Sequence, residues 1–262
     1  TVSTGPVRLE VKDLQVDRGG PKVSFDVRQG EILGIGGLVG GGRTEMIEAV
    51  FGIRRSYDGT ITIDGEPLHR NRIDASIRGG VAFVPEDRKG AGLVLSRSVL
   101  DNGSLPHLRS FTFGGWIRPL ARRNAVEKAT SSVELKYRGL SQLVGTLSGG
   151  NQQKVVLARW LTQEGRVLLL DEPTRGVDVG ARGEIYRIVR DLASHGLAVV
   201  FVSSDMPELI GLSHRVLVMR AGSIVGELDR EALDCPDAQE QIFRLASGQT
   251  LDVFGERTVC AG

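Results

Sequence analysis

Apolar and polar residues alternate along the first part of the chain, and repeated strand and helix patterns follow. Residues 7–36 contain two alternating segments and then a buried run at Ile32, Leu33 and Ile35, which predicts two antiparallel strands leading into a buried strand. Further strands are predicted at 60–63, 81–84, 167–170, 197–202, 216–219 and 223–227, and helices at 46–51, 121–137, 150–162, 181–194 and 237–246. Because strands alternate with helices, we expect an α/β fold with a mainly parallel sheet and right-handed crossovers.

The pattern changes between residues 86 and 146, where charged and glycine-rich segments surround one helical stretch. We expect one domain over residues 1–262, in which 7–86 and 151–228 form the core and an antiparallel β region. Residues 87–150 would then form a helical subdomain inserted into this core, and 229–262 a C-terminal helix and tail. The stretch 93–116 has no clear pattern and stays unassigned.

Composition limits the class of protein. With 262 residues and 40% hydrophobic content, the chain can bury a large core. Its 33 basic and 32 acidic residues give a formal net charge of +1, so no overall field attracts nucleic acid or an anionic membrane, and any such contact must be local. No apolar run approaches the length of a membrane-spanning helix, and no secretory signal is visible.

Two adjacent acids, Asp171 and Glu172, follow the aliphatic run at 167–170. In open α/β sheets ligands bind at the carboxyl ends of the strands, so these acids are well placed to hold a metal ion and a water molecule. We expect Asp171 to hold Mg²⁺ and Glu172 to polarise a water that attacks a phosphate. The alternative is a pair of solvated acids in a loop.

A glycine-rich loop, Gly37 to Thr44, lies between a predicted strand and a predicted helix. It fits the phosphate-binding pattern G-x-x-x-x-G-K-[ST], except that Arg43 stands in place of lysine. Backbone N–H groups of such a loop converge on phosphate oxygens, and Thr44 could offer its hydroxyl to Mg²⁺. Two alternatives remain: a plain glycine turn, or a dinucleotide-binding turn at Gly34, Gly36 and Gly40, for which no suitable carboxylate follows.

The segment L-S-G-G-N-Q-Q-K at 147–154 would open another helix with free N–H groups, and it is therefore a second candidate anion site. A second phosphate cradle on one domain implies a second nucleotide face. Two such faces are explained if two domains pair head to tail, each covering the ATP held by the other.

These three motifs, in this order, resemble those of ATP-binding-cassette ATPases, and the resemblance extends from about residue 7 to residue 226. L-S-G-G-N-Q-Q-K matches the signature motif, and L-L-L-D-E-P-T-R-G-V-D matches the Walker B motif and D-loop. G-L-V-G-G-G-R-T-E, V-P-E-D-R-K-G-A-G-L and S-S-D-M-P-E narrow the resemblance to the C-terminal cassette of tandem-cassette ATPases of bacterial simple-sugar importers, of the ribose, galactose and xylose type. The resemblance implies a P-loop NTPase core, and the absence of an initial methionine at Thr1 leads us to expect one half of a longer polypeptide.

The departures from the family pattern all affect the chain's own nucleotide site. Arg43 replaces the phosphate-binding lysine, and Glu45 replaces a small hydroxyl residue. Glu86 stands at the Q-loop glutamine and Ser204 at the switch histidine, while the aromatic residue expected near Asp17 to stack on adenine is absent. Serine cannot replace imidazole as a sensor of the γ-phosphate near neutral pH.

The residues that would serve a partner's nucleotide are intact. The resemblance implies a signature face made by Ser148, Gly149, Gly150, Asn151 and Gln152, together with the D-loop residue Asp178. For the chain's own ATP, the resemblance implies nucleotide contacts at Gly37, Gly40, Gly41, Gly42, Arg43, Thr44 and Glu45. It implies Mg²⁺ contacts at Thr44, Asp171 and Glu86. It also implies catalytic roles for Glu172, Ser204 and Glu86. We therefore expect an asymmetric pair, in which this chain's own site is weak and its signature completes the productive site of the other cassette. The alternative is ordinary turnover at both sites.

The implied partners are an N-terminal cassette of the same polypeptide or a second cassette, an integral membrane permease and, indirectly, a periplasmic sugar-binding protein; nucleic acid is not expected. Residues 86–108 are where such importers dock the permease, although an ordinary solvated loop explains that stretch equally well. The expected location is peripheral, on the cytoplasmic side of the bacterial inner membrane. A non-hydrolysing, nucleotide-binding regulatory module and a soluble cassette protein acting on ribosomes or DNA are the alternative functions.

Overall fold

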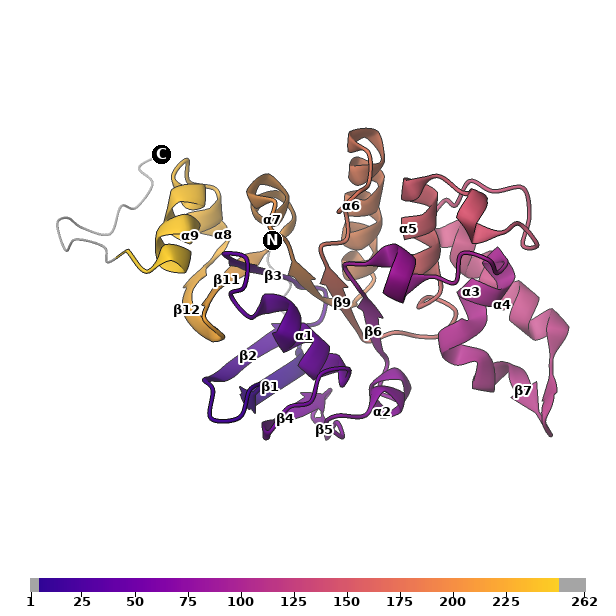
Figure 1. The fold of residues 1–262 in the computed structure, drawn as a ribbon, viewed down its shortest axis with the longest axis horizontal. Helices are drawn as coiled ribbons and strands as arrows, with labels where there is room; N and C mark the ends of the chain where they lie inside the picture. Colours follow the sequence, from indigo (N-terminus) through magenta and orange to yellow (C-terminus); the bar gives the residue numbers. More distant parts are fainter. Residues whose placement is uncertain (1–4, 250–262) are drawn as a thin grey trace.

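A six-stranded sheet forms the centre of the computed structural model, which describes residues 5–249 (Figure 1). Its order is β12-β11-β3-β10-β9-β6, and β12 is the antiparallel edge strand beside parallel neighbours. Runs of aliphatic residues form its middle strands because both faces are covered by other parts of the chain. The strands are β3 (Ile32–Gly37), β6 (Val81–Val84), β9 (Val167–Asp171), β10 (Ala198–Val202), β11 (Arg215–Arg220) and β12 (Ser223–Leu228).

A second, antiparallel sheet has the order β2-β1-β4-β5. Its alternating residues pack in register: Leu9 lies opposite Val27, and Val11 lies opposite Phe25. All four of these side chains are buried, whereas their sequence neighbours are more exposed, which is the alternation expected of a sheet with one covered face. The strands are β1 (Val7–Gln15), β2 (Lys22–Arg28), β4 (Asp58–Ile63) and β5 (Glu66–Pro67).

Helices cover the central sheet. The first helix, α1, follows β3 directly and packs against β3, β6 and β9, while α9 packs against β3, β11 and β12. Gly52 ends α1 in a left-handed conformation. The helices around the sheet are α1 (Arg43–Phe51), α2 (Ile73–Arg78), α6 (Val179–Ser194), α7 (Met206–Leu212), α8 (Arg230–Leu233) and α9 (Ala238–Ser247).

A mainly helical region lies beside the central sheet, on the right in Figure 1, opposite the C-terminal helices. It contains a short hairpin that the sequence pattern did not predict, seen at the lower right edge of that view. Its elements are a π-helical turn (Arg88–Gly92), α3 (Val99–Ser104), a 3-10 segment (Leu105–Phe111), β7 (Thr112–Phe113), β8 (Trp116–Ile117), α4 (Pro119–Ser132), a 3-10 turn (Val144–Thr146) and α5 (Gly149–Ala158).

The predicted α/β class, the mainly parallel sheet and the N-terminal antiparallel strands are confirmed, but two helix ends were predicted wrongly. The helix predicted to reach residue 137 ends at Ser132, because Glu134 takes a left-handed φ of 50° and the Leu135 N–H donates back to the Thr130 carbonyl, which closes the helix. The helix predicted to reach residue 162 ends at Ala158 and continues as turns. The predicted tail lies mostly outside the described residues. Within residues 5–249 no helix is long and apolar enough to cross a membrane.

Candidate functional site

The glycine loop lies between β3 and α1, as predicted. Gly37 has φ 147°, and a Cβ there would come within 2.3 Å of the Met219 carbonyl oxygen, so a side chain does not fit. Gly42 precedes α1 with φ 91°, and a Cβ there would come within 2.9 Å of Gly222. The loop therefore needs glycine to pass close to β11 and β12, and it leaves the helix N-terminus facing a cavity.

That cavity has a volume of about 600 Å³. It collects residues from distant parts of the sequence, because β3, β6, β9 and β10 are parallel and their carboxyl ends meet at one edge of the sheet. Most of the residues predicted for the chain's own site line it, namely Gly40, Gly41, Gly42, Arg43, Thr44, Glu45, Glu86, Glu172 and Ser204. The cavity also includes residues to which the sequence analysis gave no individual role: Val39, Thr174, Arg175, Gly176, Arg182, Asp205 and Glu208.

Thr44 and Asp171 form the pair best suited to a magnesium ion. The Thr44 hydroxyl donates a 3.2 Å hydrogen bond to the Asp171 carboxylate, which is 1% exposed at the end of β9. Burial raises the pKa of Asp171 to about 6, and the Thr44 hydrogen bond opposes this rise only in part. A buried carboxyl group with a raised pKa and a hydroxyl beside it fits a site that becomes charged when a cation arrives.

Glu86 is not in contact with this pair. It forms an ion pair with Arg175, and no hydrogen bond or ion pair joins it to Thr44 or Asp171 within residues 5–249. The same range contains no group of three or more His, Cys, Asp or Glu side chains that could hold a metal. Thr44 and Asp171 would thus hold Mg²⁺ only together with ligands from elsewhere, such as nucleotide phosphates. Of the three predicted Mg²⁺ ligands, the structure brings two together.

Arg43 lines the cavity, and its guanidinium contacts groups that follow β9 and β10. Its side chain is nearly buried, and its Nη1 donates a 2.8 Å hydrogen bond to the backbone carbonyl of Ser203. Its Nη2 lies 3.9 Å from a carboxylate oxygen of Glu172. The positive charge that a phosphate-binding loop would offer to its ligand is therefore already shared between a carbonyl and a carboxylate.

Glu172 is held on both sides. Its second carboxylate oxygen accepts a 3.1 Å hydrogen bond from the Ser204 hydroxyl. Its backbone has φ 44°, a left-handed conformation that costs a non-glycine residue about 1–3 kcal/mol. The carboxylate predicted to polarise an attacking water is therefore already engaged by the Ser204 hydroxyl and lies near the Arg43 guanidinium. The Ser204 hydroxyl therefore contacts Glu172, the predicted catalytic residue, directly. The sequence did not reveal this contact.

A buried carboxyl group that the sequence analysis missed lies behind these residues. Glu208 is 4% exposed and accepts hydrogen bonds from the hydroxyls of Thr174, at 2.7 Å, and Ser203, at 2.6 Å. Burial raises the pKa of Glu208. Thr174 follows β9 and Ser203 follows β10, so Glu208 joins the two loops that carry Glu172 and Ser204.

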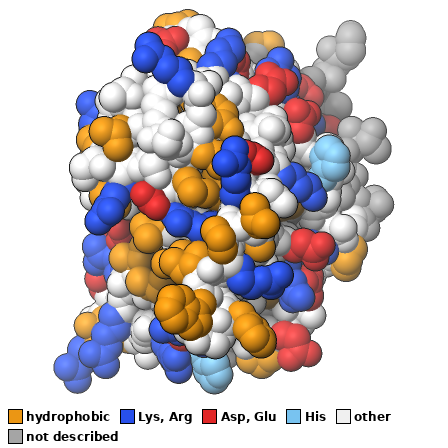
Figure 2. All heavy atoms as spheres, turned by 90° about the vertical axis from the view of Figure 1, so that its right-hand side faces the viewer, with side chains coloured by type: hydrophobic (Ala, Val, Ile, Leu, Met, Phe, Trp, Pro, Cys, Tyr) orange, Lys and Arg blue, Asp and Glu red, His pale blue; other side chains and the backbone are white. Residues whose placement is uncertain are grey.

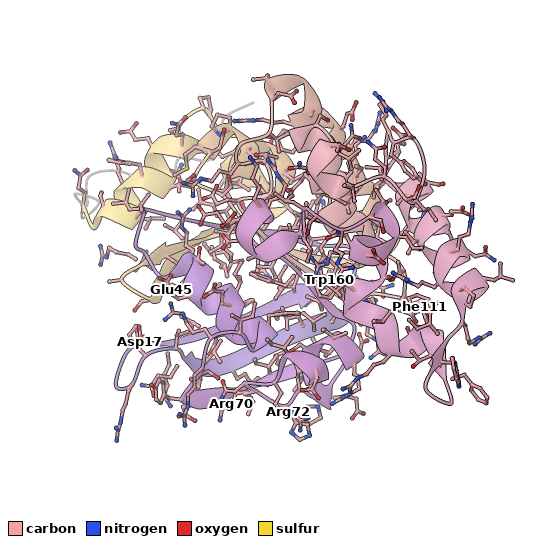
Figure 3. The ribbon with its side chains drawn as sticks, turned by 45° about the vertical axis from the view of Figure 1, so that its right-hand side comes forward. Asp17, Glu45, Arg70, Arg72, Phe111 and Trp160 are labelled. Atoms are coloured by element: carbon pink, nitrogen blue, oxygen red, sulfur yellow. The ribbon has the colours of Figure 1, made fainter. Side chains whose placement is uncertain are left out.

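Glu45 and Asp17 are two further positions at which the sequence departs from the family pattern. Glu45 lies in the first turn of α1 and lines the cavity, where it adds negative charge. Asp17 lies in the loop between β1 and β2, and Figure 3 shows both residues. The segment from Asp17 to Gly20 contains no aromatic residue, so it offers no ring on which adenine could stack.

The predicted signature residues occupy the start of α5. Ser148 is exposed and caps the helix, and it accepts a 2.9 Å hydrogen bond from the Asn151 side chain. A Cβ at Gly150 would come within 2.7 Å of the Ala181 side chain, so Gly150 lets α5 approach α6 closely. Asp178 is exposed and caps α6 by accepting from the Ala181 N–H. The N-termini of α5 and α6 thus lie side by side.

Gln152 does not face outward with the other signature residues. It is 6% exposed, and its amide donates to the carbonyls of Val144 and Leu147 at 3.4 and 3.2 Å. Its side chain holds the turn before the signature, so we correct its assignment to the face that would touch a partner's nucleotide. Arg88 connects the start of α5 to the loop that follows β9. Its Nη2 donates a hydrogen bond to the carbonyl of Gly176 and lies close to Gly149.

A family model described as "ABC transporter" matches residues 21–175, which is more than half of the chain. Among curated proteins, a putative ribose/galactose/methyl galactoside import ATP-binding protein of Pseudomonas fluorescens is 46% identical over 244 residues, covering 93% of this chain and 47% of that protein. The ribose import ATP-binding protein RbsA of Halalkalibacterium halodurans is 45% identical over 248 residues, covering 95% of this chain and 49% of that protein. The chain therefore spans about half the length of the curated relatives it matches.

Solved structures of cassettes share the fold. The dimeric structure of MJ0796, described as a bacterial ABC transporter cassette, aligns with a TM-score of 0.71 at 22% identity, covering 85% of this chain and 98% of that one. The ADP conformation of the cassette MJ1267 aligns with a TM-score of 0.73 at 20% identity, covering 90% and 98%. At this identity the likeness concerns the fold alone, and it confirms the predicted P-loop NTPase core.

Proposed function

The chain belongs to the ABC transporter family, and from this premise we propose that it is the ATP-binding, energy-coupling cassette of a bacterial sugar importer. The curated relatives named above are described as import ATP-binding proteins for ribose or galactose, and this supports the class of transported substrate. The partners in this proposal are a second cassette, a membrane permease and a periplasmic sugar-binding protein. The location is the cytoplasmic side of the inner membrane.

We further propose that the two nucleotide sites of the cassette pair are unequal. The observation that carries this proposal is the engagement of Arg43, whose guanidinium donates to the Ser203 carbonyl and lies 3.9 Å from Glu172. A phosphate entering the loop must draw Arg43 away from both partners, at a cost of about 1.5–3 kcal/mol for a charged hydrogen bond. With Ser204 on Glu172 as well, the site binds ATP weakly and turns it over slowly.

The signature residues at the start of α5 support the second part of this proposal. Ser148 and Gly149 begin a helix whose first N–H groups point outward, and Asp178 begins the adjacent helix. ATP, when bound between two cassettes, supplies the binding free energy that closes the pair and shifts the permease between states. In this pairing Ser148 and Gly149 bind phosphate oxygens of the other cassette's nucleotide, and Gly150 keeps α5 against α6.

The test uses this chain alone and mixed with a separately produced N-terminal cassette. Titration with a fluorescent ATP analogue in Mg²⁺ measures binding, and phosphate release measures turnover. We expect weak binding and almost no turnover by the chain alone, and turnover in the mixture that falls at least tenfold when Ser148 is replaced by Arg here. The Gln163→Arg variant, which adds the same single positive charge at an exposed position after α5, is the matched control and should keep full turnover. Rapid hydrolysis by this chain alone would contradict the unequal pair.

A regulatory module that binds nucleotide without hydrolysing it is the second candidate, and the contacts of Arg43 and Ser204 on Glu172 favour it for this chain's own site. It differs in one measurable respect. Under this alternative Ser148→Arg leaves the mixture's turnover unchanged, because the chain would act only through its own nucleotide.

A further inference from the structure

A small hairpin projects from the helical region between α3 and α4. Thr112 pairs with Ile117 and Phe113 pairs with Trp116 across a turn made by Gly114 and Gly115, both of which have positive φ. Two such glycines form the tight turn whose twist suits a hairpin. The backbone N–H of Arg118 donates to the Phe111 carbonyl, which extends the pairing to the base of the hairpin.

The residue at the base of the hairpin is buried, and the strands and turn of the hairpin are exposed to solvent. Phe111 is 4% exposed, and Figure 3 shows it where the hairpin leaves the helical region. Every residue from 112 to 120 is exposed. Phe113 and Trp116 are each 82% exposed, and as a directly opposed pair they stand on the same face of the hairpin. Two large aromatic side chains are therefore held side by side in water by a defined turn.

More apolar surface surrounds this pair. Leu120 is 74% exposed, and Ile117 and Leu105 are about half exposed. Figure 2, which views this end of the molecule, shows hydrophobic side chains gathered over the lower half of the face with Lys and Arg side chains around them. A contiguous apolar patch with a charged rim marks a contact surface, whereas single exposed apolar residues do not.

The sequence that forms the hairpin and its flanks is basic. Between residues 105 and 126 the sequence contains the basic residues Arg109, Arg118, Arg122 and Arg123 and no acidic residue. Arg122 and Arg123 form ion pairs with Asp101 and Glu127, but no ion pair is formed by Arg109 or Arg118 among residues 5–249. The chain as a whole carries a formal charge of only +1, so this positive field is local to the hairpin.

We propose that the hairpin 112–117, with Leu120 and the flanking arginines, is a contact site for an anionic phospholipid surface. Exposed Trp and Phe side chains favour the boundary between water and lipid, and nearby Arg side chains favour anionic headgroups. A protein partner would need a surface of about 800 Å² on each side, which a projecting six-residue hairpin does not offer. A fluid lipid surface can close around such a projection without a matching shape.

This contact is independent of the proposed nucleotide chemistry, and vesicles without any permease test it. The 262-residue chain is sedimented with vesicles of phosphatidylglycerol and phosphatidylcholine in equal parts, and with vesicles of phosphatidylcholine alone, at low salt. We expect binding to the anionic vesicles and at least tenfold weaker binding to the neutral ones. Phe113→Ser with Trp116→Ser should weaken anionic binding by at least about tenfold. Arg109→Gln with Arg118→Gln should weaken it by about thirtyfold, since each basic residue near the surface contributes about fivefold.

Trp116 also provides a direct signal. The chain has two tryptophans, of which Trp160 is 6% exposed and Trp116 82% exposed, so anionic vesicles should shift the emission of the native chain to shorter wavelength and leave that of Trp116→Ser unchanged. Tyr57→Ser is the control, because Tyr57 is a half-exposed aromatic residue beside β4 and should not affect binding. All variants change exposed side chains, and circular dichroism checks their fold.

The result that overturns the proposal is equally clear. Failure of the native chain to bind anionic vesicles, or binding that the hairpin variants leave unchanged, shows that the patch serves another partner, such as the permease. Equal binding to neutral and anionic vesicles refutes the anionic surface as its ligand.

Discussion

Replacing Asp171 with Asn should stabilise the nucleotide-free chain near neutral pH. Asp171 is 1% exposed, and burial raises its pKa from 3.8 to about 6. Asn has nearly the same shape, and its side-chain oxygen can still accept the hydrogen bond from Thr44. The variant therefore removes the cost of a buried charge and keeps the local packing.

The sign and size follow from the two pKa values. The folded chain holds the Asp171 proton more tightly than the unfolded chain does. The contribution of Asp171 to the free energy of unfolding is therefore fully present below pH 3.8 and is lost as the pH rises to about 6. A rise of about two units, at about 1.4 kcal/mol per unit, makes the loss about 3 kcal/mol as an upper estimate. Above pH 6 Asp171→Asn should exceed the native chain in stability by up to this amount, and at pH 4 the difference should shrink to about 0.5 kcal/mol.

Urea unfolding followed by circular dichroism, from pH 4 to pH 8 in EDTA, measures the difference. The other titrating groups cancel between the native chain and the variant, so the difference reports Asp171. Adding Mg²⁺ and ATP should then favour the native chain, since the carboxylate gains a cation that the amide cannot hold. A variant that is less stable than the native chain at pH 7.5 without nucleotide would refute the reasoning.

Three further predictions test separate contacts. Arg43→Lys should raise the affinity for ATP about tenfold in a fluorescence titration, because lysine cannot keep both the Ser203 contact and the approach to Glu172; an unchanged affinity would contradict this. Gly150→Ala should cost about 1–3 kcal/mol in thermal unfolding, because its Cβ would meet α6 at 2.7 Å, whereas the control Gly183→Ala, with open space around its Cβ, should cost nothing. Glu208→Ala should cost about 1–3 kcal/mol in urea unfolding, since it leaves two buried hydroxyls without an acceptor; a loss below 0.5 kcal/mol, by the same estimate, would show that water replaces the carboxylate.

The strands that could be predicted are those whose positions the local pattern of apolar and polar residues determines. Strands β6, β9 and β10 are buried on both faces and appear as aliphatic runs, so the sequence located them within one residue. Asp171 comes directly after the apolar run and is the last residue of β9. The hairpin was missed because two-residue strands have no period, although the adjacent glycines between Phe113 and Trp116 are a turn signal.

The sequence predicted most of the residues that line the cavity, but it did not predict the directions of their side chains. Arg43 turns toward a carbonyl 160 residues away, a contact that depends on the packing of β3 beside β10. Asp205 caps α7 by accepting a hydrogen bond from the Glu208 N–H. In the structure the Glu208 side chain turns inward to Thr174 and Ser203, because their hydroxyls lie at the ends of two neighbouring strands.

Turnover by the assembled pair of cassettes tests the central claim, that this chain's own site is the weaker one and that its signature completes the other. The measurement compares Glu172→Gln in this chain with the corresponding Glu→Gln change in the partner, in mixtures of equal concentration. We predict that Glu172→Gln here leaves turnover within about twofold of the native mixture, and that the partner's change abolishes it. Loss of all turnover on Glu172→Gln in this chain alone would contradict the account.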